Sequence, residues 1–215
     1  HFAAISRFVA DRIRRCYGRE SDVIYPPVDL SRFRVEEASE GYYLVVSALA
    51  PYKRVDLAVG AANRLGRRLL VVGSGPEEQR LRALAGPTVE FLGWRSDEDV
   101  AEIYARCRAL LFPAVEDFGI VPLEAMASGK PVIALGQGGA TETVIPPGGA
   151  EPPTGLFFEP QTPDALADAI RRFEADPSRF DPKALRSRAE AFDRPIFKER
   201  IAAWVARRWE EFSRC

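Results

Sequence analysis

Six short apolar runs recur along the chain and constrain its fold more than any other feature. They occupy residues 43–49, 69–73, 89–93, 109–113, 131–135 and, more weakly, 155–159. Because the runs are apolar throughout rather than alternating, they indicate strands covered on both faces, as in a parallel sheet. Stretches typical of helices separate them, at about 54–65, 76–84, 97–106, 121–128 and 162–174. This alternation predicts an α/β domain with a doubly wound, Rossmann-like parallel sheet.

The two ends of the chain carry further helical patterns. Residues 3–18 have the apolar spacing of an amphipathic helix that ends at Gly18, and their excess of arginine is typical of a solvated helix face. A short strand interrupted by two prolines is expected at 23–33. Two more helices are expected at about 182–191 and 195–213. The last has a stripe of aromatic and aliphatic residues, for which we expect packing into the core.

Composition limits the class of protein. The 215 residues include 47% hydrophobic and 28% charged residues, the balance of an ordinary soluble globular protein. The formal net charge of -1 gives no basis for nucleic-acid binding or for strong attraction to a membrane. Three widely spaced cysteines suggest neither a disulfide framework nor a metal motif, which favours a reducing compartment such as the cytoplasm. Since the chain begins with His1, we expect a fragment or a processed chain.

Ligands of open parallel sheets bind at the carboxyl ends of the strands, so the loops that follow the apolar runs are candidate sites. In 47-SALAPYKRVD-56, Lys53 and Arg54 precede a helix, where cations are disfavoured unless an anion such as a phosphate is bound. A solvent-exposed lysine is the alternative. In 72-VGSGPEEQR-80, Gly73 and Gly75 begin a dinucleotide-binding pattern whose third glycine is replaced by Glu78. This loop fits either a nucleotide close to the backbone or a tight turn.

Asp97 and Asp99 match an Asp-x-Asp pattern that chelates divalent metals in some enzymes. We favour a structural interpretation, with Ser96 as a helix N-cap and the acids complementing the helix dipole. We therefore expect no metal site.

Two glutamates flank a glycine turn in 116-EDFGIVPLE-124. The amides of Gly119, Ile120 and Val121 are expected to begin a helix, and such amides attract phosphate. Carboxylates would repel a phosphate, so Glu116 and Glu124 are better suited to accept hydrogen bonds from sugar and ribose hydroxyls. A nucleotide sugar offers phosphate to the helix amides and hydroxyl groups to the two carboxylates. Alternatively, Glu124 only complements the helix dipole and Glu116 is solvated.

Taken together, these segments resemble the C-terminal domain of family 4 retaining glycosyltransferases with the GT-B fold. The E-x7-E pattern of 116-EDFGIVPLE-124 is that family's signature. Its context occurs in the family's order in 22-DVIYPPVDLSRF-33, 47-SALAPYKRVDLAV-59, 71-VVGSGPE-77, 91-FLGW-94 and 128-SGKPVIALGQGGATETV-144. The resemblance implies an interdomain helix and linker over 1–33, a nucleotide-sugar-binding domain over 34–194 and a C-terminal crossover helix over 195–215. It is strongest to mannosyltransferase-like members that build surface polysaccharides.

The resemblance also implies residue roles. Glu116 would hold donor-sugar hydroxyls, Glu124 the ribose, and Lys53 the diphosphate, with Glu116 and Lys53 as the catalytic pair. The other implied donor-binding residues are Ser47, Arg54, Gly73, Trp94, Phe118, Gly119, Ile120 and Val121. Ala48 stands where the family usually has an arginine, so Arg54 is a candidate for the second cation, or diphosphate binding is weaker.

The implied reaction transfers a hexose, with mannose expected, from GDP-mannose or a UDP-sugar to a saccharide or glycolipid acceptor, without a metal cofactor. It needs an N-terminal GT-B domain, and it allows peripheral contact with a membrane. A non-catalytic nucleotide-sugar-binding module is the main alternative for the isolated chain. A glycoside hydrolase and a dinucleotide-dependent oxidoreductase are weaker alternatives, the latter because the fingerprint is incomplete.

Overall fold

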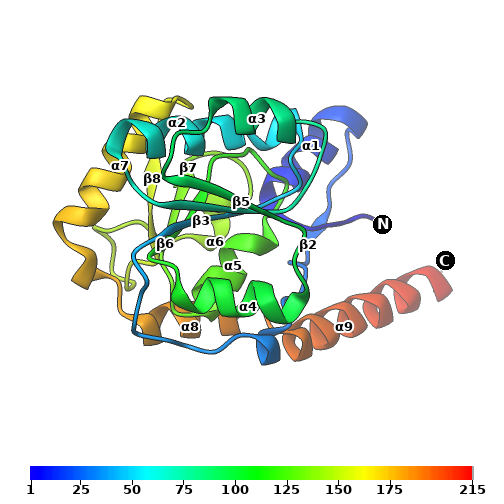
Figure 1. Ribbon diagram of the computed structural model, residues 1–215. Helices are drawn as coiled ribbons and strands as arrows, with labels where there is room; N and C mark the ends of the chain where they lie inside the picture. Colours follow the sequence, from blue (N-terminus) through cyan, green and yellow to red (C-terminus); the bar gives the residue numbers. More distant parts are fainter. Residues whose placement is uncertain (215) are drawn as a thin grey trace.

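A computed structural model describes residues 1–214 and contains a six-stranded, fully parallel sheet (Figure 1). The strands are β3 (Tyr43–Val46), β4 (Leu69–Val72), β5 (Val89–Gly93), β6 (Ala109–Phe112), β7 (Val132–Leu135) and β8 (Gly155–Phe158). Their spatial order is β5-β4-β3-β6-β7-β8. The order reverses between β3 and β6, the kind of switch point at which doubly wound sheets bind ligands. The predicted fold class is confirmed.

Helices cover both faces of the sheet (Figure 1). On one face lie α2 (Val55–Leu65), α3 (Glu78–Leu84) and α7 (Pro163–Ala175), and on the other α4 (Asp97–Arg106), α5 (Ile120–Ala127) and α8 (Pro182–Glu190). The short α6 (Ala140–Thr143) follows β7. Helices α1 (Arg7–Tyr17) and α9 (Arg194–Ser213) belong to the chain ends. The observed bounds differ from the predicted strands and crossover helices by only a few residues.

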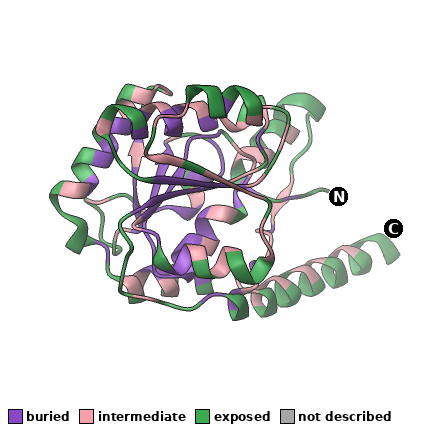
Figure 2. Ribbon diagram, viewed as in Figure 1, coloured by how far each residue is buried: buried purple, intermediate pink, exposed green. Residues whose placement is uncertain are grey.

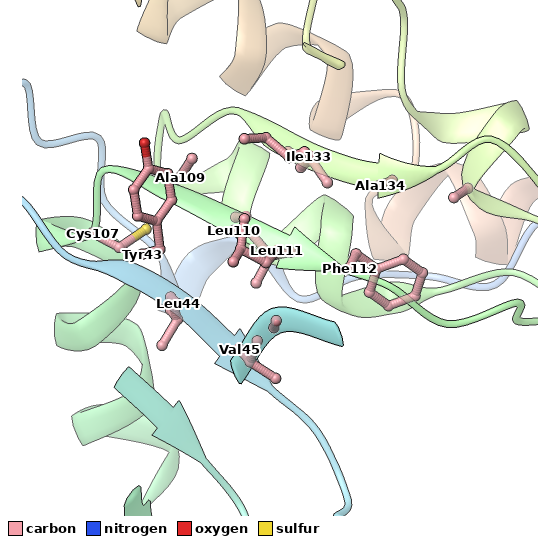
Figure 3. Packing of buried hydrophobic residues seen from close by; sticks show 14 of the residues in the cluster. Tyr43, Leu44, Val45, Cys107, Ala109, Leu110, Leu111, Phe112, Ile133 and Ala134 are labelled. Atoms are coloured by element: carbon pink, nitrogen blue, oxygen red, sulfur yellow. The ribbon is translucent and has the colours of Figure 1, made fainter. Parts of the chain in front are cut away.

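The core lies between the sheet and its two helical layers (Figure 2). In its centre, Leu44 of β3, Leu110 of β6 and Ile133 of β7 are almost completely buried and lie close together (Figure 3). Strands buried on both faces explain why their sequences are apolar throughout rather than alternating.

The N-terminal segment differs from the predicted continuous helix. Residues Ala3–Ala4 form strand β1, which pairs in parallel with β2 (Asp22–Val23). Helix α1 starts only after Ser6, whose side chain caps it, and ends at Gly18 in the left-handed conformation, as predicted. The strand predicted over 23–33 is confined to β2, and a 3₁₀ helix occupies Leu30–Arg32.

The prediction that the aromatic stripe of α9 packs into the core is wrong. Val205, Trp209 and Phe212 are 53%, 66% and 69% exposed. Only the first half of the stripe is anchored, where Trp204 donates a hydrogen bond of 2.7 Å to Asp22. Helix α9 extends away from the body of the sheet, so no core lies beneath its second half (Figure 1). Across residues 1–214, the helices are all too short or too polar to cross a membrane.

Candidate donor-binding site

A pocket of about 430 Å³ opens at the carboxyl edge of the sheet. It is built by the loops after β3, β4, β5 and β6 and by the first turns of α4 and α5. Its lining residues are Val46, Ser47, Ala48, Lys53, Val72, Gly73, Ser74, Trp94, Arg95, Val100, Glu116 and Val121. Six of the sequence-predicted site residues are among them: Ser47, Lys53, Gly73, Trp94, Glu116 and Val121. Their contact with a donor stays a prediction.

Lys53 and Glu116 meet in this pocket although they are far apart in the sequence. The Lys53 ammonium donates to Glu116 Oε1 at 2.5 Å, and the side chains are only 17% and 22% exposed. Lys53 lies after β3 and Glu116 after β6, the two strands that flank the switch point. The pocket wall therefore carries an ion pair largely shielded from water.

Local backbone geometry directs Lys53 into the pocket and Arg54 away from it. Lys53 ends a 3₁₀ helix, Pro51–Lys53, and Arg54 adopts a left-handed conformation with φ 51° before α2 begins. The Arg54 guanidinium is bonded to both carboxylate oxygens of Asp56, each at 3.1 Å. Arg54 is not among the pocket residues, so the structure does not bring the proposed second cation to Lys53.

The loops after β3 and β4 pass so closely that only glycine fits between them. A Cβ atom at Gly73 would lie 1.9 Å from the carbonyl oxygen of Ser47, and one at Gly75 would lie 2.5 Å from that of Leu49. These contacts account for the two glycines of the incomplete fingerprint. They also leave bare backbone at the pocket wall.

The glycine-rich loop after β7 supports the backbone of Glu116. The Gly139 amide donates to the Glu116 carbonyl oxygen at 2.8 Å. The Phe118 side chain is buried and stacks on Tyr25, with ring centroids 5.6 Å apart, so the side chain is not available to a ligand. On the outer side, Asp117 forms a two-point ion pair with Arg12 of α1. The position of Glu116 is thus fixed from several directions.

Gly119, Ile120 and Val121 do begin a helix, as predicted. Gly119 is the N-cap of α5, with φ 86°, and no side chain in the described part of the chain caps its amides. Pro122, predicted near the first helical position, is the third residue of α5, where its missing N–H still costs no intrahelical bond. Val121 lines the pocket, whereas Phe118, Gly119 and Ile120 are not among its lining residues.

Glu124 lies deeper than Glu116, in the second helical turn rather than the first. It is not among the pocket residues, and its Oε2 accepts a hydrogen bond of 2.9 Å from the hydroxyl of Tyr104 on α4. Burial raises the pKa of the Glu124 carboxyl above its usual value, although the hydrogen bond from Tyr104 opposes that shift. A desolvated carboxylate favours hydroxyl ligands, because they restore lost hydrogen bonds.

Arg95 is a pocket residue that the sequence patterns did not predict. It follows Trp94 directly, lines the pocket, and donates to the carbonyl oxygen of Trp94 at 2.9 Å. A cation two residues after the end of β5 is a signal that the sequence offers. Trp94 is 76% exposed at the mouth of the pocket, so an aromatic face is available there.

The N-cap interpretation of the Asp-x-Asp segment is confirmed. The Ser96 hydroxyl accepts from the Asp99 amide at 3.2 Å, and both aspartates lie in the first turn of α4. Within residues 1–214, no three His, Cys, Asp or Glu side chains are grouped so that they could hold a metal ion.

The fold places the chain in a known structural class, because solved structures that are similar to it are GT-B glycosyltransferases. One is sucrose-phosphate synthase from Thermosynechococcus elongatus, with a TM-score of 0.85 and 30% identity over 97% of this chain and 58% of that one. Anabaena HepE in complex with UDP and glucose has the same fold, with a TM-score of 0.80 and 24% identity over 95% of this chain and 62% of that one.

Residues 29–192 match the family described as glycosyl transferases group 1, and the chain belongs to that family. Among curated relatives, a GDP-mannose-dependent α-(1-6)-phosphatidylinositol monomannoside mannosyltransferase of Mycobacterium tuberculosis is 31% identical over 81% of this chain. The alignment covers 52% of that relative's length. The chain therefore spans just over half the length of the proteins it resembles.

Proposed function

We propose that this chain binds a nucleoside-diphosphate sugar and, together with an N-terminal acceptor domain, transfers a hexose with retention of configuration to a saccharide or glycolipid. The observation that carries the proposal is the Lys53–Glu116 pair at the switch point, inside a pocket bounded by glycine backbone. Lys53, a cation for the diphosphate, therefore lies next to Glu116, whose carboxylate can accept hydrogen bonds from the hydroxyls of the donor sugar.

The pair can bind a donor without separating. An ammonium group has three donors, and Glu116 Oε1 takes only one of those of Lys53. Its remaining donors are available to phosphate oxygens. Glu116 Oε2 receives no hydrogen bond from the described residues and can accept one from a sugar hydroxyl. Because the pair is shielded from water, such charge-assisted hydrogen bonds are stronger than at an open surface.

In the proposed step, the bond between the anomeric carbon and the diphosphate oxygen breaks, and its electron pair leaves with the diphosphate. The acceptor hydroxyl oxygen attacks the same face of the sugar and passes its proton to the departing diphosphate. Lys53 and the first amides of α5 stabilise the charge that accumulates on the leaving group. No metal ion takes part in this scheme.

The resemblance to mannosyltransferases favours mannose as the sugar and GDP as the carrier, with a UDP-sugar as the alternative. The proposal assigns acceptor binding to an N-terminal domain, since the alignments cover only 52% of one relative and 58% of another. The proposed location is the cytoplasm, with peripheral membrane contact through that domain.

Titration calorimetry of the chain with GDP, UDP, GDP-mannose and UDP-glucose tests the binding step. Lys53→Ala should weaken the binding of a nucleoside diphosphate by about tenfold or more, because a hydrogen bond to a charged group contributes about 1.5–3 kcal/mol. Glu116→Gln should weaken the binding of the nucleotide sugar more than the binding of the nucleoside diphosphate. Lys183→Ala, which removes an exposed lysine on α8, is the matched control and should change neither affinity.

In the two-domain protein, Lys53→Ala and Glu116→Ala should abolish transfer. Near-normal rates in either variant would contradict the assignment. Because the chain spans only about half of its relatives, binding without transfer is the expected behaviour of the chain alone. If the two-domain protein also binds donor but transfers nothing, the chain is a binding module and the catalytic proposal fails.

A further inference from the structure

We propose that Tyr104 is a positioning residue for donor binding, which fixes the Glu124 carboxylate so that one oxygen is presented to the ribose hydroxyls of the nucleotide. The inference rests on the proposed function, since it concerns the same pocket. Tyr104 lies inside a predicted helix, and no sequence motif marks it for this role.

The packing of α4 against α5 places this pair directly behind the pocket. Val100 of α4 and Val121 of α5 line the pocket. Tyr104 is four residues after Val100 and Glu124 is three residues after Val121, so each lies one turn further along the same helix face. Helical side chains lean toward the N-terminus of their helix, and both helices begin at the carboxyl edge of the sheet. The Glu124 carboxylate therefore leans back toward the pocket.

Tyr104 is held too firmly to adjust to the carboxylate. Its side chain is completely buried, and Phe33 packs edge-on against its ring with centroids 5.8 Å apart. The hydroxyl therefore sets the position of Glu124 Oε2 at 2.9 Å. Oε1 accepts no hydrogen bond from the described residues, and it is not fully enclosed by protein atoms. One oxygen is fixed and the other remains open.

The charges around Glu124 make this hydrogen bond important. Burial raises the pKa of the carboxyl, and Asp97 at the start of α4 acts in the same direction. Tyr104 and Arg32, from the 3₁₀ helix before β3, lower that pKa. On the other side of α5, Arg186 of α8 is bonded to the carbonyl oxygens of Phe33 and Ala127. Without the phenol, Glu124 takes up a proton more readily and loses acceptor strength.

Calorimetry with ribonucleotides and their 2′,3′-dideoxy counterparts isolates this effect. The wild-type chain should prefer GDP or UDP over the dideoxy form. Tyr104→Phe should reduce that preference about five- to tenfold while leaving the dideoxy affinity unchanged. As the pH falls, the ribose preference should decline, and the midpoint should lie at higher pH in Tyr104→Phe. Glu124→Gln should show little preference and no such pH dependence.

Tyr43→Phe is the matched control. Tyr43 is also a buried tyrosine, and it donates to a glutamate, Glu174, at the same distance of 2.9 Å. It lies at the first residue of β3, at the opposite edge of the sheet from the pocket. Both variants should lower the melting temperature, but only Tyr104→Phe should change the ribose preference.

The outcomes separate the two proposals. If Tyr104→Phe is destabilised but keeps the wild-type ribose preference and pH midpoint, its role is structural and this inference is wrong. If the wild-type chain binds no nucleoside diphosphate, the proposed function is overturned and this inference with it.

Discussion

At the scale of single residues, the buried carboxylate of Glu124 should reduce stability at neutral pH. Its carboxyl has a raised pKa in the folded state, so the folded protein holds this proton more tightly than the unfolded chain does. The contribution of Glu124 to the free energy of unfolding is therefore most favourable below the unfolded pKa of about 4.3. It declines as the pH rises through the folded value, which leaves a destabilising charge at neutral pH.

Glu124→Gln should consequently raise the melting temperature at pH 7 and weaken ribonucleotide binding. If removal of the buried charge stabilises the folded state by about 1 kcal/mol, the melting temperature should rise by roughly 2–4 °C. The gain should shrink toward zero at about pH 4, where the wild-type carboxyl is protonated in both states. Thermal unfolding from pH 4 to 8, with Glu190→Gln on the exposed surface as control, measures this. A variant that is less stable at pH 7 than at pH 4, relative to wild type, would contradict the argument.

Sequence patterns located the pocket residues whose placement follows from strand ends. Lys53, Gly73 and Glu116 are predictable because each lies at the end of an apolar run or in the loop that follows one. The patterns failed where side-chain direction decides, since Arg54 is itself in the left-handed conformation and its side chain turns to Asp56. They also failed for Tyr104, whose role depends on how α4 packs against α5, a long-range arrangement that local periodicity does not encode.

At the scale of elements, the glycine-rich loop and the Glu116 loop behave as one unit. A Cβ atom at Gly139 would lie 2.3 Å from the Cα of Phe118 and 2.6 Å from its carbonyl oxygen. Both contacts are to backbone, so a rotamer change cannot relieve them. The loop that carries Glu116 must move if residue 139 has a side chain.

Gly139→Ala should therefore destabilise the protein by about 1–3 kcal/mol and weaken nucleotide-sugar binding by more than it weakens nucleoside-diphosphate binding. Gly149→Ala is the control, because nothing lies within 4 Å of a Cβ atom there. Chemical denaturation and calorimetry on both variants provide the measurement. If both variants keep a stability and a nucleotide-sugar affinity close to those of the wild type, the two loops are not coupled.

The strands and crossover helices were predictable because each one is buried by its neighbours in the sheet, and burial imposes a readable apolar pattern. The chain ends were not. In α1 and α9 the same apolar spacing occurs without a covering layer, and none of their residues is fully buried. An apolar pattern predicts that a face will be covered, but not which part of the protein covers it.

At the scale of the whole molecule, an apolar surface remains exposed beside the two chain ends. It consists of Val205, Trp209 and Phe212 on α9, with Phe2 and Tyr17 at the N-terminal segment. Asp22 links the two parts, since it accepts from Trp204 and pairs with Arg208. The alignments cover only 52% and 58% of the lengths of two relatives. We propose that this surface packs against the N-terminal domain of the proposed two-domain enzyme, and that in the chain alone it is available to other copies.

The isolated chain should consequently self-associate in a concentration-dependent manner. Sedimentation velocity should give a mass above 23.9 kDa at high concentration, and the double variant Trp209→Ser/Phe212→Ser should associate at least about tenfold more weakly, a difference of about 1.4 kcal/mol. Trp94→Ser is the control, because Trp94 is equally exposed but lies at the pocket mouth. If Trp94→Ser abolishes association and the α9 variant does not, the copies meet through the pocket instead. A chain that stays monomeric at all concentrations would show that the apolar surface of α9 needs no cover.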